Sequence, residues 1–227
     1  MPLPPVLAID GPSGSGKGTV CRRVAAALGW HLLDSGALYR LVAHGAAAAG
    51  LDATDEAGHA AYARTMDVVF GATPSGDESI LLGGLEVTSA IRTESAGAAA
   101  SRVAAWSAVR AALVERQRAF AVPPGLVADG RDMGSVIFPE AGLKVFLTAS
   151  AEERAARRHK QLMEKGINAN LAALSLEIAE RDRRDATRPV APLVATPDAV
   201  TIDSTRLPPD TVVAQVLSLA RARFGVG

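Results

Sequence analysis

The chain has 227 residues, of which 48% are hydrophobic and 21% are charged, and this composition excludes wholesale disorder and predicts a buried core. Its 24 basic and 24 acidic side chains give a formal net charge of zero, which argues against a protein that binds nucleic acid or a membrane surface through bulk charge. A single cysteine, Cys21, excludes an internal disulfide and a multi-cysteine metal site. No apolar run approaches the ~20 residues of a membrane span. The N-terminal residues lack the basic region of a secretory signal, so we expect a cytoplasmic protein.

The zero net charge conceals an uneven distribution. Residues 1–100 carry six basic and ten acidic side chains, whereas residues 101–227 carry 18 basic and 14 acidic ones. Only four of the 24 basic residues are lysines. Arginine is the planar, bidentate binder of phosphate and carboxylate groups. Composition alone leaves two explanations open, a genome bias towards arginine and a phosphate-binding function.

Five short apolar runs are predicted to form buried strands, and helical patterns separate them. We expect strands at residues 6–9, 31–34, 126–129, 144–147 and 199–202. We expect helices over residues 19–28, 95–121, 151–164, 171–184 and 210–223. Strands that alternate with helices predict an α/β fold, with a five-stranded parallel sheet and helices on both faces.

The segment from residue 67 to residue 88 breaks this alternation. Residues 68–70 and 80–82 are strand-like, and Gly83-Gly84 is a hairpin signal before residues 85–87. The sequence therefore predicts a small antiparallel β insert on a parallel core. We find no internal repeat and no low-complexity linker, so a second independent domain is not expected.

The strongest motif lies between the first predicted strand and the first predicted helix. It consists of Gly11-Pro12-Ser13-Gly14-Ser15-Gly16-Lys17-Gly18-Thr19. Glycines let backbone N–H groups surround an anion, the helix N-terminus adds positive potential, and the lysine supplies a mobile charge for β- and γ-phosphates. The general pattern places Ser or Thr directly after the lysine, whereas Gly18 intervenes here before Thr19. We therefore expect Mg²⁺ to be held through water, near Thr19 and Asp129.

Several classes of protein use such a loop. A guanine-specific switch would carry Asn-Lys-x-Asp, but neither of the two asparagines, Asn168 and Asn170, is followed by lysine. A kinase needs a second substrate site. A non-catalytic ATP-binding module should lack a second arginine cluster, and a nucleic-acid-binding protein would need more stacking platforms than nine aromatic residues provide.

Polar residues follow two of the predicted strands, and they supply a candidate second site. They are Asp34, Ser35 and Arg40 after one strand, and Asp129, Arg131 and Asp132 after the other. Because the carboxyl ends of parallel strands line the ligand crevice of an open α/β sheet, these side chains should face the crevice of the phosphate loop. Asp129 stands where this fold carries a carboxylate associated with Mg²⁺.

Arginines also gather on two predicted helices. Arg181, Asp185 and Arg188 share one face if their helix extends that far, and Pro189 ends it soon afterwards. A second cluster precedes a predicted turn at Lys165-Gly166 and consists of Arg154, Arg157 and Arg158. Solvated faces with intrahelical ion pairs are the alternative interpretation of both clusters.

Taken together, these motifs resemble the bacterial cytidylate kinases, a family of nucleoside monophosphate kinases. The resemblance covers nearly the whole chain and is carried by residues 11–19, 33–36, 39–40, 128–134, 181–188 and 190–193. It implies transfer of the γ-phosphoryl group of ATP, with Mg²⁺, to CMP and dCMP. A kinase with another base preference, for UMP or AMP, is the alternative.

The resemblance also implies an organisation of the chain as one P-loop kinase domain, residues 1–227. The core would comprise residues 1–35, 100–150 and 185–227. The antiparallel insert, about residues 36–99, would bind the monophosphate, and residues from about 151 to 170 would form a short helical lid. We expect a monomer whose partners are nucleotides.

Roles for individual residues follow from the same resemblance. ATP is expected to bind the loop at residues 11–19, with Arg157 or Arg158 closing over its phosphates. The expected catalytic residues are Lys17, Asp129, Arg131, Arg157 and Arg188. The acceptor phosphate would be held by Ser35, Arg40, Arg131 and Arg188. Arg181 and Asp185 would reach the ribose, the cytosine readers would be Ser101, Arg110 and Asp132, and Asp34 completes the CMP-binding set.

Overall fold

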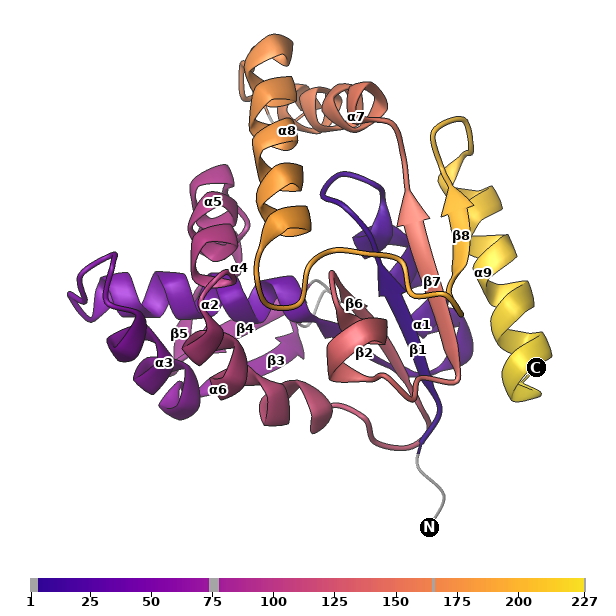
Figure 1. Cartoon of the computed structure of the whole chain (residues 1–227), viewed down its shortest axis with the longest axis horizontal. Helices are drawn as coiled ribbons and strands as arrows, with labels where there is room; N and C mark the ends of the chain where they lie inside the picture. Colours follow the sequence, from indigo (N-terminus) through magenta and orange to yellow (C-terminus); the bar gives the residue numbers. More distant parts are fainter. Residues whose placement is uncertain (1–3, 74–77, 165, 227) are drawn as a thin grey trace. The chain divides into compact units, whose positions relative to one another are not determined.

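The computed structural model describes residues 4–73, 78–164 and 166–226, so the predicted turn at Lys165 and the first three residues lie outside the described part of the chain. The chain divides into two compact units (Figure 1). The first combines Met1–Asp34 with Gln117–Gly227, and the second is Ser35–Arg116. The second unit is therefore inserted into the first, between two of its strands.

The first unit is built on a five-stranded parallel sheet, as the sequence predicts. Its strands are β1 (Val6–Asp10), β2 (His31–Asp34), β6 (Leu126–Gly130), β7 (Leu143–Thr148) and β8 (Val200–Asp203). Their order is β2-β6-β1-β7-β8, with every neighbouring pair parallel. The register places Asp34 beside Asp129, and Asp10 beside Gly130. The C-terminal ends of three adjacent strands therefore bring their polar residues to one edge of the sheet.

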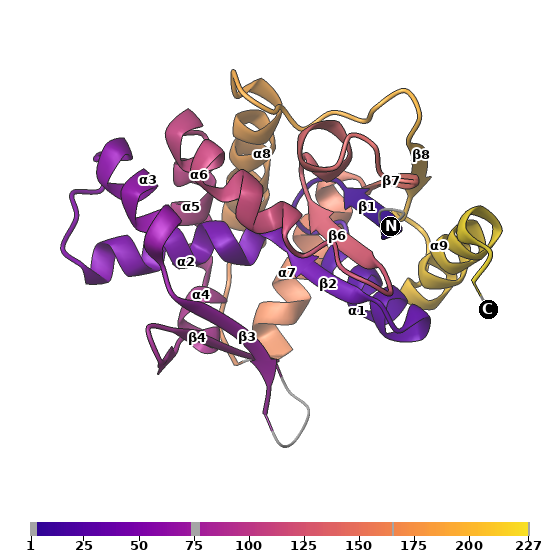
Figure 2. The same cartoon turned by 90° about the horizontal axis from the view of Figure 1, so that it is seen from below.

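Helical segments lie on both faces of this sheet. On one face, α1 (Lys17–Leu28) and α9 (Pro209–Phe224) lie side by side and share a hydrophobic core with the strands (Figure 2). A short π-helix, η1 (Met133–Ile137), contacts β1 and β6. Side chains alternate along a strand. Since Leu7 and Ile9 belong to the α1–α9 core, Asp10 faces the opposite side, where η1 lies.

Two further helices of the first unit pack against each other. They are α7 (Ala151–Glu164), with the bounds that the sequence predicts, and α8 (Leu171–Thr187). The expected end of α8 at residue 184 is too early, and Arg188 caps this helix with an extended backbone. Arg181 and Asp185 thus lie one turn apart on α8, while Arg188 follows its end. No helix in the described ranges is both long and apolar enough to cross a membrane.

The second unit joins a helical layer to a small antiparallel sheet. Its elements are α2 (Ser35–Ala48), α3 (Glu56–Thr65), β3 (Val68–Ala72), β4 (Glu78–Leu82), β5 (Leu85–Glu86), α4 (Thr88–Ile91), α5 (Glu94–Val103) and α6, which spans Ser107–Arg118. The order β3-β4-β5 confirms the predicted insert, and Figure 2 shows β3 and β4 side by side. Positive φ angles of 56° and 79° at Gly83 and Gly84 make the tight turn that this dipeptide predicts.

One expectation for the second unit differs from the structure. The single helix expected over residues 95–121 is wrong, because α5 ends at Val103 and α6 begins at Ser107. Trp106 in the break packs edge-on against His59, and Glu56 accepts a hydrogen bond from the Ala108 N–H at 2.9 Å. These contacts with α3 set the break. The compact unit continues to Arg116, and its helix α5 packs along α2.

Candidate active site

The phosphate loop connects β1 to α1 and has the backbone of an anion cradle. Gly11 has a φ of 151°, and a Cβ there would clash with the carbonyl oxygen of Leu147 on β7. Gly14 and Gly16 have φ values of 78° and 91°, and Gly16 is the N-cap of α1. Only glycine adopts such angles readily. The glycines therefore let the loop wrap closely around the N-terminus of α1, as the motif predicts.

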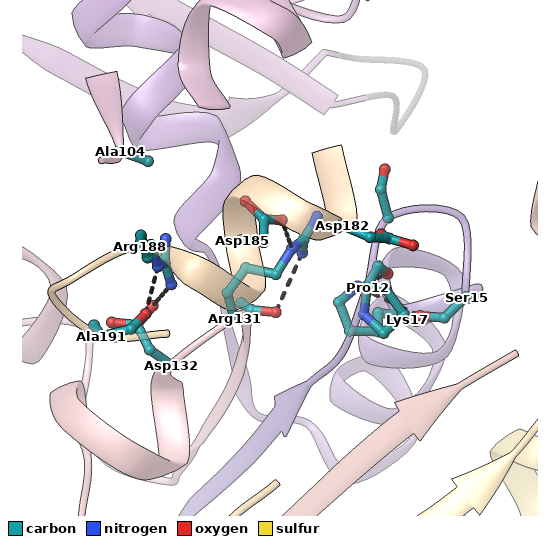
Figure 3. Close-up of polar contacts among 12 residues, drawn as sticks. Pro12, Ser15, Lys17, Ala104, Arg131, Asp132, Asp182, Asp185, Arg188 and Ala191 are labelled. Atoms are coloured by element: carbon teal, nitrogen blue, oxygen red, sulfur yellow. Dashed lines mark hydrogen bonds and ion pairs between the residues drawn. The ribbon is translucent and has the colours of Figure 1, made fainter. Parts of the chain in front are cut away.

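Lys17 is buried and folds back over this loop. Its Nζ donates to the carbonyl oxygen of Pro12 at 2.7 Å and lies 3.4 Å from Ser15 Oγ (Figure 3). Burial lowers the pKa of Lys17 to about 7; the positive charge of Arg131 adds to this, whereas Asp129 opposes it. The loop thus holds a desolvated ammonium group that an anion would stabilise.

Asp129, at the end of β6, faces the loop from the strand edge. Loss of solvent raises the pKa of Asp129 to about 6; Lys17 opposes this, and Asp34 on the neighbouring strand adds to it. A Cβ at Gly18 would lie 3.5 Å from Asp129 Oδ2, so the carboxylate approaches the position where the general pattern carries a hydroxyl.

A magnesium ion that arrives with ATP fits this arrangement. Among the residues that the structure describes, no group of three or more carboxylate, imidazole or thiol side chains could hold a metal by itself. Mg²⁺ ordinarily keeps several waters and binds through one or two carboxylates together with substrate phosphates. The Asp129 carboxylate, which faces the phosphate loop, matches that donor set.

Two arginine–carboxylate pairs stand beyond the strand ends in the first unit. Arg131 Nε donates to Asp185 Oδ2 on α8 at 3.0 Å, and Arg188 Nη2 lies 3.5 Å from Asp132 Oδ1 (Figure 3). Arg188 also donates to the carbonyl oxygen of Ala191. The Arg188 and Asp132 side chains are only 5% and 4% exposed. The structure therefore brings together four of the expected CMP-binding residues, and they neutralise one another.

The expected CMP-binding residues of the second unit are also mostly buried. Arg40 on α2 donates to the carbonyl oxygens of Ile91 at 2.7 Å and Thr93 at 3.1 Å. Arg110 on α6 lies over the Tyr39 ring, 5.7 Å from its centroid, and donates to the carbonyl oxygen of Ala104 at 3.3 Å. Two serines complete the set, Ser35 at the start of α2 and Ser101 on α5, and both are buried. Within the described residues Ser101 Oγ has no hydrogen-bond partner.

The two arginines of the expected lid, Arg157 and Arg158, differ in what they contact. Arg157 donates to the carbonyl oxygen of Ser204 at 2.6 Å, to Ser204 Oγ at 3.1 Å, and to Glu153 at 2.8 Å. A Cβ at Gly16 would lie 4.0 Å from Arg157 Nη1, so this guanidinium lies beside the phosphate loop. Arg158 Nη1 donates to Gln161 at 3.1 Å on its own helix.

Three residues that received no role from the sequence support this site, although one of them, Arg154, belongs to the arginine cluster on its predicted helix. Arg154 donates to the carbonyl oxygen of Ser13 and pairs with Asp182 on α8. Ser204 is within hydrogen-bond distance of the carbonyl oxygen of Ser15, at 3.1 Å. The third, Asp10, accepts two backbone N–H groups of η1. The sequence signals were the cluster that contains Arg154 and the position of Asp10 directly before the glycine-rich loop, whereas Ser204 carried no signal.

A phosphate-cradling loop with its lysine, together with arginines at the neighbouring strand ends, defines a P-loop phosphotransferase that takes a second phosphorylated substrate. The cytidylate kinase family matches residues 7–222 of the chain. Three proteins named cytidylate kinase are 57%, 56% and 55% identical to it, from Azotobacter vinelandii, Nitrosomonas eutropha and Methylococcus capsulatus. The alignments cover 97%, 95% and 96% of this chain and 96%, 94% and 97% of those proteins. The chain belongs to the cytidylate kinase family and is an enzyme that phosphorylates CMP with ATP.

Proposed function

We propose that this kinase uses MgATP and accepts dCMP as well as CMP, as a monomer in the cytoplasm where both nucleotides occur. The observation that carries the proposal is a buried lysine in a phosphate loop beside arginines that are paired with carboxylates. ADP formation should be measured with CMP, dCMP, UMP, AMP and GMP as acceptors. The two cytosine nucleotides should be the best substrates. Equal rates with UMP or AMP would contradict the base preference, and sedimentation tests the oligomeric state.

The reaction needs no general base. An oxygen of the acceptor phosphate forms the new bond to the γ-phosphorus while the bond to the β-phosphate oxygen of ADP breaks. The second pKa of a phosphate monoester is about 6, so near pH 7 the acceptor is mostly a dianion and already nucleophilic. In agreement with this, His31 and His59 interact with backbone carbonyl oxygens outside the site, those of Pro123 and Asp55.

Catalysis by this chain would then rest on alignment and on neutralisation of charge. The phosphate loop at residues 11–19 would hold the ATP phosphates, with the Lys17 ammonium on the transferring group. Mg²⁺, when bound with ATP, supplies further positive charge, and Asp129 is the carboxylate that would hold it through water. Thr19, the last residue of this loop, is exposed and would face the same waters.

Arg131 and Arg188 would hold the acceptor phosphate of CMP. In the structure Arg131 pairs with Asp185, and Arg188 pairs with Asp132. In this proposal Asp185 would bind a ribose hydroxyl and Asp132 would bind the base. A bound phosphate would take over the arginines and release both carboxylates to accept hydrogen bonds. Arg181 on α8 joins the ribose side in this proposal, and Asp34, Ser35 and Arg40 complete the set.

Base selection would follow from hydrogen-bonding complementarity. Cytosine presents an N4 amino donor, which Asp132 can accept, whereas uracil presents an O4 acceptor there. Arg110 would donate to N3 or O2 of cytosine, and N3–H of uracil would oppose it. The buried Ser101 hydroxyl, which lacks a hydrogen-bond partner within the described residues, would supply a further contact.

Binding of a nucleotide should cause proton uptake near pH 8. With its pKa lowered to about 7, Lys17 is mostly neutral at pH 8, and the phosphates would favour its charged form. The carboxyl groups with pKa values raised to about 6, Asp10 and Asp129, are already ionised there and contribute little. Binding of ADP should therefore take up about one proton. Calorimetry in two buffers of different ionisation enthalpy measures this number, and a value near zero contradicts the role of Lys17.

The lid arginines should differ in their effect on ATP binding. Since Arg157 lies beside the phosphate loop, we expect Arg157→Ala to raise the KM for ATP roughly 10- to 100-fold, as loss of a hydrogen bond to a charged group does. Arg158→Ala is the matched control on the same helix, and a change of less than about threefold is expected for it. Steady-state kinetics at saturating CMP measures both. A larger rise in the KM for ATP in Arg158→Ala than in Arg157→Ala would assign the contact to Arg158.

A further inference from the structure

Asp10, the last residue of β1, is a buried carboxylate that no step of the proposed reaction uses. It is 7% exposed, and both of its oxygens accept hydrogen bonds. The backbone N–H of Met133 donates to Oδ1 and that of Gly134 donates to Oδ2, each at 2.8 Å. Because burial of a carboxylate costs free energy, these two partners identify what the side chain holds in place.

The two partners are the first residues of η1, and the residue before them is the proposed base reader. Asp132 is the N-cap of η1, with φ −150° and ψ 25°. An aspartate at an N-cap ordinarily accepts an N–H of the first turn with its own carboxylate. Here the Asp132 side chain makes no capping hydrogen bond. Its Oδ1 lies 3.5 Å from Arg188 Nη2 instead.

Asp10 can contact η1 because successive side chains of β1 point to opposite faces of the sheet. Leu7 and Ile9 face the core with α1 and α9, so the next side chain projects to the face where η1 contacts the strand. Gly134 lets the backbone come close, because a Cβ there would lie 3.1 Å from Lys144 Cγ and 3.4 Å from Asp10 Oδ2. The strand β1, which leads into the phosphate loop, thus also fixes η1 and the adjacent Asp132.

We propose that Asp10 is a positioning residue for cytosine recognition. By accepting the N–H groups of Met133 and Gly134, it fixes the backbone from which the Asp132 carboxylate would reach the N4 amino group of the base. The inference rests on the proposed base-reading role of Asp132. It predicts an effect on the choice of acceptor base, while ATP binding is left unchanged.

The test is Asp10→Asn in the full-length enzyme. The amide keeps the shape of the side chain but offers one acceptor oxygen, and its NH₂ group opposes a backbone donor. The ratio of kcat/KM for CMP to that for UMP should fall at least tenfold, mainly through the KM for CMP. The KM for ATP should change less than twofold.

Asp55→Ala is the control for loss of a capping carboxylate elsewhere in the chain. It alters another capping carboxylate, which accepts the Gly58 N–H at 2.8 Å on α3. This variant should lower the melting temperature and leave the CMP-to-UMP ratio unchanged. A purely structural role for Asp10 would give the same pattern in Asp10→Asn, and that result overturns the proposal.

The Asp132→Ala background separates this inference from the proposed function. Asp10→Asn should have no further effect on the CMP-to-UMP ratio once Asp132 is replaced, since the proposed effect acts through that carboxylate. An additive effect in the double variant overturns the proposal for Asp10 alone. An unchanged ratio in Asp132→Ala overturns the base-reading role itself. If Asp10→Asn does not fold, Gly134→Ala perturbs the same contact from the η1 side, and an unchanged ratio in that folded variant also overturns the proposal.

Discussion

Lys17→Met is expected to lower kcat for CMP phosphorylation by about 10³-fold or more, which is the scale on which a preorganised cationic group stabilises a transferring phosphoryl group. Lys17 is the lysine of the phosphate loop, and its Nζ already lies 2.7 Å from a carbonyl oxygen of that loop. Methionine has a similar length but no charge. Because the developing negative charge would lose its nearest ammonium group, the effect should fall on kcat more than on the KM for CMP. Steady-state kinetics with ATP and CMP measures both constants.

Lys160→Met is the matched control for this substitution. Lys160 lies on α7, and its side chain is 80% exposed. It should retain activity within about twofold, as exposed charges with weak ion pairs usually do. Thermal unfolding of both variants checks that each is folded. A folded Lys17→Met enzyme with more than a tenth of the normal kcat would contradict the catalytic role of the lysine.

Asp132→Ala is expected to reduce discrimination between CMP and UMP by roughly 10- to 100-fold, because a buried unpaired polar group costs about 1–3 kcal/mol. The variant removes the acceptor for the cytosine amino group and also the repulsion of uracil O4. It also deprives Arg188 of a carboxylate 3.5 Å away, which should strengthen the hold of that arginine on any acceptor phosphate. Absolute activity will therefore change for two reasons. The ratio of kcat/KM values for CMP and UMP isolates the reading of the base.

Glu140→Ala provides the comparison for that experiment. Glu140 is an exposed carboxylate that follows η1 in the same connecting segment. Its replacement should leave the ratio of CMP to UMP unchanged. Full discrimination in a folded Asp132→Ala enzyme would assign base selection to other residues, with Arg110 and Ser101 the next to replace.

The elements that the sequence predicted best are those with a strong local signal. β1 is five buried residues between Pro5 and Gly11, and α7 has an amphipathic pattern with clear ends. The sequence patterns did not predict the helix α2. Its side chains Leu38, Leu41 and Val42 are all fully buried. A helix buried on most sides carries little of the 3.6-residue period by which patterns detect helices. Likewise the break between α5 and α6 depends on contacts with α3, which no local pattern contains.

In the candidate site, too, local sequence signals predicted some features, and others depend on contacts between distant residues. The phosphate loop was predictable because its glycines and lysine are contiguous in the sequence. The pairs of Arg131 with Asp185 and of Arg188 with Asp132 join residues more than 50 positions apart, so only the fold reveals them. The choice between Arg157 and Arg158 turns on the rotation of α7 about its axis. Adjacent residues on a helix point about 100° apart, and packing decides which one meets the loop.

Arg154 joins three segments that belong to different parts of the proposed reaction. Its guanidinium donates to the carbonyl oxygen of Ser13 in the phosphate loop at 3.0 Å and binds both carboxylate oxygens of Asp182 on α8. Arg157, one turn along α7, makes a comparable attachment through Ser204 to the carbonyl oxygen of Ser15. Any rotation of α7 must therefore break or carry with it bonds to the backbone that would surround the ATP phosphates. In the proposed function α7 belongs to the lid, so opening of that lid would also loosen the phosphate loop, and product ADP would lose its cradle as its exit opens.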